Sequence, residues 1–142
     1  MKTARTLISI VLLFAATTAV FAQTENRSLM KVSIPFSFTV DSQKLPAGQY
    51  YVIDVVAERT LGLTTADRKH TVIVNDLPSY ANKAPLESHL VFQRYGDEYF
   101  LTEVWCKGNN VERSPMAGKQ ATALARNGVS AEPVIILAYA VR

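Results

Sequence analysis

Strict alternation of apolar and polar residues is the feature that most limits how this chain can fold. In KVSIPFSFTV, residues 31–40, every even position is valine, isoleucine or phenylalanine, and most odd positions are polar. Such a period of two is typical of a β-strand that is buried on one side. Pro35 cannot donate a hydrogen bond to a neighbouring strand, so the pattern predicts an edge strand, or a strand with a bulge at this position.

Further short runs follow, separated by turn signals. Leu45-Pro-Ala-Gly48 has proline at the second position of a four-residue turn and glycine at the fourth, and Tyr50 to Ala57 then reads as a strand. Residues 59–65 and 71–74 predict another pair of strands. The proline-broken segment 75–87 predicts a long loop.

The segment LVFQRYGDEYFLTEVW, residues 90–105, predicts a hairpin that turns at Gly96-Asp97. The side chains that share a face depend on the register of the pairing. A two-residue loop puts Leu90, Phe92, Tyr99, Leu101 and Trp105 on one face, whereas a one-residue bulge groups Leu90 and Phe92 with Phe100 and Val104. The sequence leaves both registers open.

The C-terminal part predicts one helix and one more strand. Ser114 and Pro115 have the pattern of an N-cap and a first helical residue, and Gly128 suits the position just after the helix. The closing run PVIILAYAVR predicts a strand that is covered on both sides or inserted between neighbours. Together these patterns predict an all-β fold: an antiparallel sandwich or partly open barrel of about seven strands, with one short C-terminal helix before the last strand.

The first 22 residues have the features of a cleaved signal peptide. Lys2 and Arg5 precede an apolar run from Leu7 to Ala16, and the segment ends in Val20-Phe21-Ala22. The run is only about ten residues long, half of the roughly twenty that a membrane-spanning helix needs. We therefore expect cleavage after Ala22, export to the periplasm or the extracellular space, no membrane span after cleavage, and a single β-rich domain over residues 23–142.

Charge and cysteine content narrow the function classes. The 15 Lys and Arg residues face 12 Asp and Glu, and two of the basic residues belong to the leader, so the mature chain is nearly neutral. It has no basic cluster that would follow a phosphate backbone, and nucleic acid is not expected as a partner. The lone Cys106 cannot form a disulfide within the chain. We expect it to be buried as a small apolar residue, the alternative being an exposed thiol.

The sequence shows no convergent set of catalytic or metal-binding residues. It has no G-x-S-x-G turn and no H-x-H or C-x-x-C spacing, and its two histidines are His70 and His89. We expect no enzyme activity, no metal and no cofactor. One alternative is a small cysteine-dependent hydrolase in which His89, across the hairpin from Val104, activates Cys106. Another is a barrel that carries a small apolar ligand in its interior.

Three sequence blocks occur in a characteristic order: IPFSF, LPAGQY and RYGDEYFL. In these blocks the chain resembles a family of small exported bacterial proteins of uncharacterised function, which show I-P-F-x-F, L-P-A-G-x-Y and R-Y-G-x-x-Y-F-L motifs. The resemblance covers nearly all of the mature chain and implies no catalytic or ligand-binding residue.

The sequence therefore predicts a non-enzymatic, exported β-domain with a binding or structural role in the cell envelope. Its partner is expected to be an envelope protein or a glycan. The contact surface is expected to be an exposed row of aromatic residues, with Tyr95, Tyr99 and Trp105 as candidates, or the unpaired edge of the strand over residues 31–40. The other interpretation of these aromatic side chains is that they pack in the core.

Overall fold

The computed structural model describes residues 27–54 and 60–141. Over these residues the chain forms ten β-strands and one short α-helix. The strands are β1 (Arg27–Ile34), β2 (Phe38–Val40), β3 (Gln43–Leu45), β4 (Gly48–Asp54), β5 (Thr60–Thr65), β6 (Thr71–Tyr80), β7 (Ser88–Tyr95), β8 (Glu98–Trp105), β9 (Val111–Pro115) and β10 (Glu132–Ala140), and the helix is α2 (Lys119–Arg126). The expected signal peptide, residues 1–22, lies outside the described residues.

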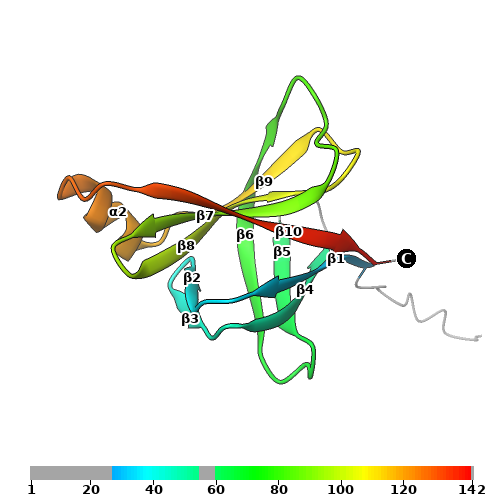
Figure 1. Ribbon diagram of the computed structural model, residues 1–142, viewed down its shortest axis with the longest axis horizontal. Coiled ribbons are helices and arrows are strands. Elements are labelled where there is room, and N and C mark those ends of the chain that lie inside the picture. Colours follow the sequence, from blue (N-terminus) through cyan, green and yellow to red (C-terminus); the bar gives the residue numbers. More distant parts are fainter. Residues whose placement is uncertain (1–26, 55–59, 142) are drawn as a thin grey trace, which may run out of the picture.

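Eight of the strands close into an antiparallel barrel (Figure 1). Their order is β8-β7-β10-β1-β4-β5-β6-β9, and β9 pairs again with β8. The other two strands, β2 and β3, form a hairpin that joins β8 through a parallel pairing of Thr39 with Phe100. The predicted all-β class with one short helix before the last strand is confirmed. Closure pairs each barrel strand on both sides and so removes the free edges of an open sheet.

The alternating run over residues 31–40 is not the single edge strand that was expected. β1 ends at Ile34 and lies between β10 and β4, so both of its edges are paired. The chain bends after Pro35 and continues as the separate strand β2. The period of two persists across the bend because the apolar residues of both strands face the same core.

The expected start of the helix at Ser114 and Pro115 is also wrong. These residues end β9, and their backbone pairs with the second half of β6. The same pairing makes residues 75–80 part of a strand, where the sequence predicted a loop. The helix begins at Lys119, and Gly128, with φ of 73°, follows its C-cap residue as predicted.

The β7–β8 hairpin combines the two registers that the sequence left open. Gly96 and Asp97 form the two-residue loop, and Gly96 has the positive φ, 62°, that such turns need. Farther from the turn, a bulge beside Thr102 shifts the pairing. Phe92 pairs with Leu101 on the turn side of the bulge, and Val91 with Glu103 and Leu90 with Val104 on the other side. The bulge therefore turns Val104 inward, and Trp105 comes to lie on the outer face.

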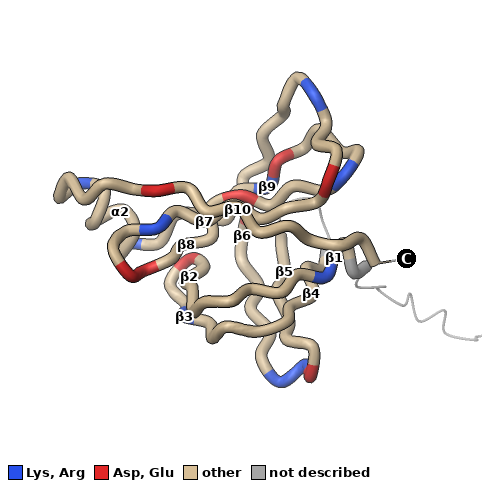
Figure 2. Tube along the Cα trace, viewed as in Figure 1, with Lys and Arg blue, Asp and Glu red and all other residues tan. Residues whose placement is uncertain are grey.

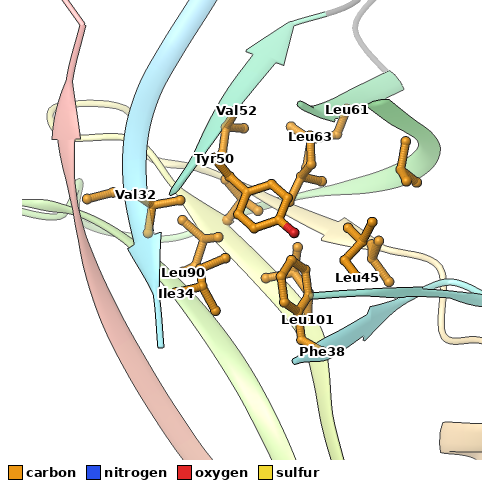
Figure 3. Packing of buried hydrophobic residues seen from close by; sticks show 14 of the residues in the cluster. Val32, Ile34, Phe38, Leu45, Tyr50, Val52, Leu61, Leu63, Leu90 and Leu101 are labelled. Carbon is orange, nitrogen blue, oxygen red and sulfur yellow. The ribbon is translucent and has the colours of Figure 1, made fainter. Parts of the chain in front are cut away.

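Apolar side chains fill the described interior of the barrel (Figure 3). Phe38 of β2 reaches into this core, with its ring centroid 5.3 Å from that of Tyr50 and 5.4 Å from that of Phe92. The β2–β3 hairpin is thus packed against the barrel by its apolar side. The Tyr50 hydroxyl donates a hydrogen bond to the Pro46 carbonyl oxygen at 2.6 Å, which satisfies the polar atom of this buried ring.

Candidate binding surface on the outer face of β10

Strand β10 carries apolar side chains on both of its faces. Val134, Ile136 and Ala138 pack against the barrel core. The alternate residues point outward, and their exposed fractions are 60% for Ile135, 55% for Leu137 and 76% for Tyr139. Of the two arrangements predicted for this run, insertion between neighbours is the one found. The sequence of β10, EPVIILAYA, has no charged residue after Glu132 at its start, and Figure 2 shows the C-terminal part of the strand in tan. The uncovered face is therefore apolar over most of its length.

Neighbouring strands extend this outer surface. Leu137 pairs with His89 of β7, and His89 pairs with Trp105 of β8. The His89 and Trp105 rings are stacked, with centroids 6.0 Å apart and planes 18° apart. The Trp105 indole N–H donates a hydrogen bond to the Glu103 carboxylate at 2.8 Å, which holds the ring in place. We call the following six residues the β10 face: Leu86, His89, Trp105, Ile135, Leu137 and Tyr139.

Two shallow hollows adjoin Leu137. One, of about 430 Å³, has walls of Leu86, His89, Ile135 and Leu137 together with Glu87 and Lys107. The other, of about 390 Å³, lies toward Tyr139 and is again lined by Leu137, Glu87 and Lys107. Each hollow therefore combines apolar walls with one acidic and one basic side chain. An apolar centre with polar groups around it is typical of protein–protein contact surfaces.

Lys31 of β1 borders this surface next to Tyr139. It pairs with Tyr139 on one side and with Tyr51 of β4 on the other. Its Nζ atom lies 5.8 Å from the centroid of the Tyr51 ring, a cation–π distance. The lysine charge is thus positioned by an aromatic ring at the margin of the β10 face.

The structure does not bring Tyr95, Tyr99 and Trp105 together. Tyr99 stacks on Phe36, with ring centroids 3.9 Å apart, and Tyr95 contacts the edge of Phe100 at 5.8 Å. The bulge in β8 separates Tyr99 from Trp105, because it reverses the alternation between the two positions. Of the three residues, only Trp105 belongs to the β10 face.

Cys106 and His89, the residues of the hydrolase hypothesis, have different surroundings. Cys106 is partly buried and packs against the apolar core. The His89 ring lies on the outer face against Trp105, with its Nδ1 3.0 Å from the Glu87 carbonyl oxygen. His89 pairs with Trp105. The expected position of His89 across the hairpin from Val104 is therefore wrong. The described ranges contain no group of three His, Cys, Asp or Glu residues placed to hold a metal ion.

The sequence reasoning missed the aliphatic part of this surface, Leu86, Ile135 and Leu137. The closing run nevertheless carried a signal. A strand with one solvated face has one apolar and one polar set of alternate residues, whereas both sets are apolar between Val134 and Tyr139. Such a strand needs cover on two sides, and the described part of the chain covers one.

The chain matches no protein-family model, no curated protein and no solved structure. No helix within residues 27–54 and 60–141 is long and apolar enough to cross a membrane.

Proposed function

We propose that this protein is an exported, non-enzymatic binding module that contacts a protein of the cell envelope through the β10 face. The proposal is supported by one observation above all: Ile135, Leu137 and Tyr139 stand exposed in a row along a single strand. Burial of apolar surface contributes about 25 cal/mol for each Å² removed from water. Large contiguous apolar patches on soluble proteins mark sites of interaction, and a partner that covers this row gains that free energy.

The chemistry of the face favours a protein over a glycan. Its centre is formed by the aliphatic side chains of Ile135 and Leu137, which protein interfaces bury at their centres. A sugar ring stacks instead on a free, flat aromatic face. The Trp105 ring already has His89 against one face, so the aromatic part of the surface is partly occupied from within the molecule.

The outer surface is also a better candidate for binding than the barrel interior. The carrier hypothesis requires space between the strands for an apolar ligand. The described interior is instead occupied by large side chains, with Phe38, Tyr50 and Phe92 in edge-to-face contact. The β10 face, by contrast, is open to a partner.

Export is part of the proposal, and the leader sequence supports it. Cleavage after Ala22 produces a mature chain that begins at Gln23. The test is to express the full chain in a Gram-negative bacterium, release the periplasm by osmotic shock and sequence the N-terminus. A released protein that starts at Gln23 is expected. A full-length chain that stays in the cytoplasm contradicts export.

The contact surface is tested with two matched substitutions. Leu137→Glu puts a charge at the centre of the β10 face. Ile73→Glu is the control, because Ile73 lies on β6, outside the face, and is exposed to the same fraction, 55%. Each immobilised variant is incubated with solubilised envelope proteins, and the retained proteins are quantified by mass spectrometry.

We expect at least one protein that the wild type and Ile73→Glu retain equally. Leu137→Glu should retain it less by about tenfold or more, because a charge in an apolar contact removes a central part of the binding energy. Equal retention by all three variants contradicts the assignment of the β10 face.

A further inference from the structure

We infer that the β10 face is occupied by a second copy of this chain, related to the first by a two-fold axis that passes near Leu137. The inference rests on the proposed function, because it uses the same contact surface and identifies the envelope protein that binds there as a second copy of this chain. Two-fold pairs are the commonest form of assembly among soluble proteins, and such an interface must be complementary to itself. Area, shape and charge of the β10 face all meet this condition.

The exposed apolar area is of the order that each partner of a stable pair buries. Four large apolar side chains of the face are more than half exposed: Leu86 (79%), Ile135 (60%), Leu137 (55%) and Tyr139 (76%). Together they offer on the order of several hundred Å² of apolar surface, a scale comparable with the roughly 800 Å² that each partner contributes to a standard interface. Strand β10 is nine residues long and has a barrel strand on each side. Two such surfaces can pack face to face as two sheets do.

The shape of the face provides both a projection and a recess. Leu86 and Tyr139, its two most exposed members, stand beside the hollows that adjoin Leu137. With volumes of about 390 and 430 Å³, each hollow has room for a large side chain. A two-fold axis near Leu137 carries the projecting side chains of one copy into the hollows of the other, and the reverse contact is then identical.

The charges that line the two hollows are also self-complementary. Glu87 and Lys107 line both hollows, and no ion pair among the described residues involves either side chain. In the proposed pair the axis runs between these two side chains, so that Lys107 of each copy lies near Glu87 of the other and two equivalent ion pairs form. Charges of one sign in the hollows would repel those of the second copy, whereas each hollow is lined by one acidic and one basic side chain.

The test is the mass of the exported protein in solution, measured by sedimentation velocity over a wide range of concentrations. The wild type and the control Ile73→Glu are expected to dimerise with the same dissociation constant. Leu137→Glu and Tyr139→Ser are expected to sediment as single chains, and circular dichroism verifies that each variant is folded. Two variants are used so that a folding defect in one does not remove the test.

A charge exchange tests the orientation of the two copies. Glu87→Lys and Lys107→Glu each put like charges together and should weaken dimerisation by roughly tenfold. The double variant restores both pairs and should recover most of the affinity. Failure of the double variant to recover overturns the proposed two-fold arrangement.

The outcomes separate this inference from the proposed function. If the wild type stays monomeric at every concentration but Leu137→Glu still loses its envelope partner, the dimer is overturned. The proposal of a binding module that uses the β10 face then still stands. If the protein dimerises and neither Leu137→Glu nor Tyr139→Ser weakens the dimer, the β10 face is not the site of self-association.

Discussion

The carboxylate of Asp76 and the guanidinium of Arg113 form a two-point ion pair inside the barrel. Arg113 Nε donates to Oδ2 at 2.6 Å, and Nη2 donates to Oδ1 at 3.1 Å. Nη2 also donates to the Thr60 carbonyl oxygen at 3.1 Å. One side chain of β9 therefore connects β6 with β5. The Asp76 side chain is fully buried and that of Arg113 nearly so, and such charges are stable only when they are paired and hydrogen-bonded.

Removal of the acidic partner should therefore be costly. Asp76→Ala leaves the Arg113 guanidinium buried without this carboxylate, and we expect a loss of about 3–5 kcal/mol in the free energy of unfolding. Urea unfolding measures the loss. The control is Glu132→Ala, because Glu132 is an exposed carboxylate 3.9 Å from Arg94, and surface pairs contribute at most about 1 kcal/mol. Equal unfolding midpoints for the two variants contradict the importance of the buried pair.

Tyr50 should make the protein sensitive to alkali. Burial raises the pKa of its hydroxyl above the ordinary value, which is about 10 in the unfolded chain. Above that pH the unfolded state releases the proton and the folded state keeps it, so stability falls as pH rises. The contribution is fully present below about pH 10 and is lost as pH increases through the raised pKa of the folded protein.

The test compares Tyr50→Phe with the wild type in urea at a series of pH values. At neutral pH the variant should be less stable by about 0.5–1.5 kcal/mol, because it lacks the hydrogen bond to Pro46. Above about pH 10 the gap should narrow, since phenylalanine does not titrate. Tyr80→Phe, at an exposed position, is expected to follow the wild-type curve. Parallel curves for Tyr50→Phe and the wild type would falsify the role of Tyr50.

The β7–β8 hairpin shows how far the sequence could predict the fold. The turn was predictable because Gly96 suits the positive φ that the loop requires. The bulge was not, because the segment has apolar residues in both alternate sets: Tyr99 and Leu101 in one, Phe100 and Val104 in the other. Alternation alone cannot show where two such sets exchange faces. For this reason the sequence analysis wrongly grouped Trp105 with Tyr99 in the candidate site.

Strand β9 shows a second reason why the prediction was incomplete. Its sequence, VERSP, has no alternating apolar pattern, so hydrophobic periodicity could not identify it as a strand. Its place is determined by contacts distant in sequence: the Arg113 pair with Asp76, and backbone pairing with β6 and β8. The exposure of Ile135 and Leu137 was hidden for a related reason, because a strand that is apolar on both faces does not reveal which face the fold covers.

Gly118 is a position where the structure leaves no room for the added methyl group of alanine. A Cβ atom there would lie 1.7 Å from the backbone oxygen of Asp41, between the start of α2 and the β2–β3 turn. One of these segments must move, and overpacking of this kind costs about 1–3 kcal/mol. Gly48→Ala is the control, because its nearest contact, a carbon of Tyr50 at 3.9 Å, is ordinary packing. Similar urea midpoints for the two variants contradict the close approach.

Trp105 and Phe38 provide the sharpest comparison between the outer face and the core. Phe38 is buried between Tyr50 and Phe92, so Phe38→Ala should cost about 3–5 kcal/mol. Trp105 is only partly buried, and Trp105→Ala loses the stack with His89 and the hydrogen bond to Glu103. We expect a cost of about 1–2 kcal/mol for that variant.

Both variants are compared with the wild type by urea unfolding at one protein concentration, because self-association makes apparent stability depend on concentration. Circular dichroism is the common signal, since Trp105→Ala removes the single tryptophan. A loss for Trp105→Ala as large as that for Phe38→Ala would place the indole in the core. The β10 face would then be confined to the aliphatic residues of β10 and to Leu86, with His89 and Tyr139 at its margin.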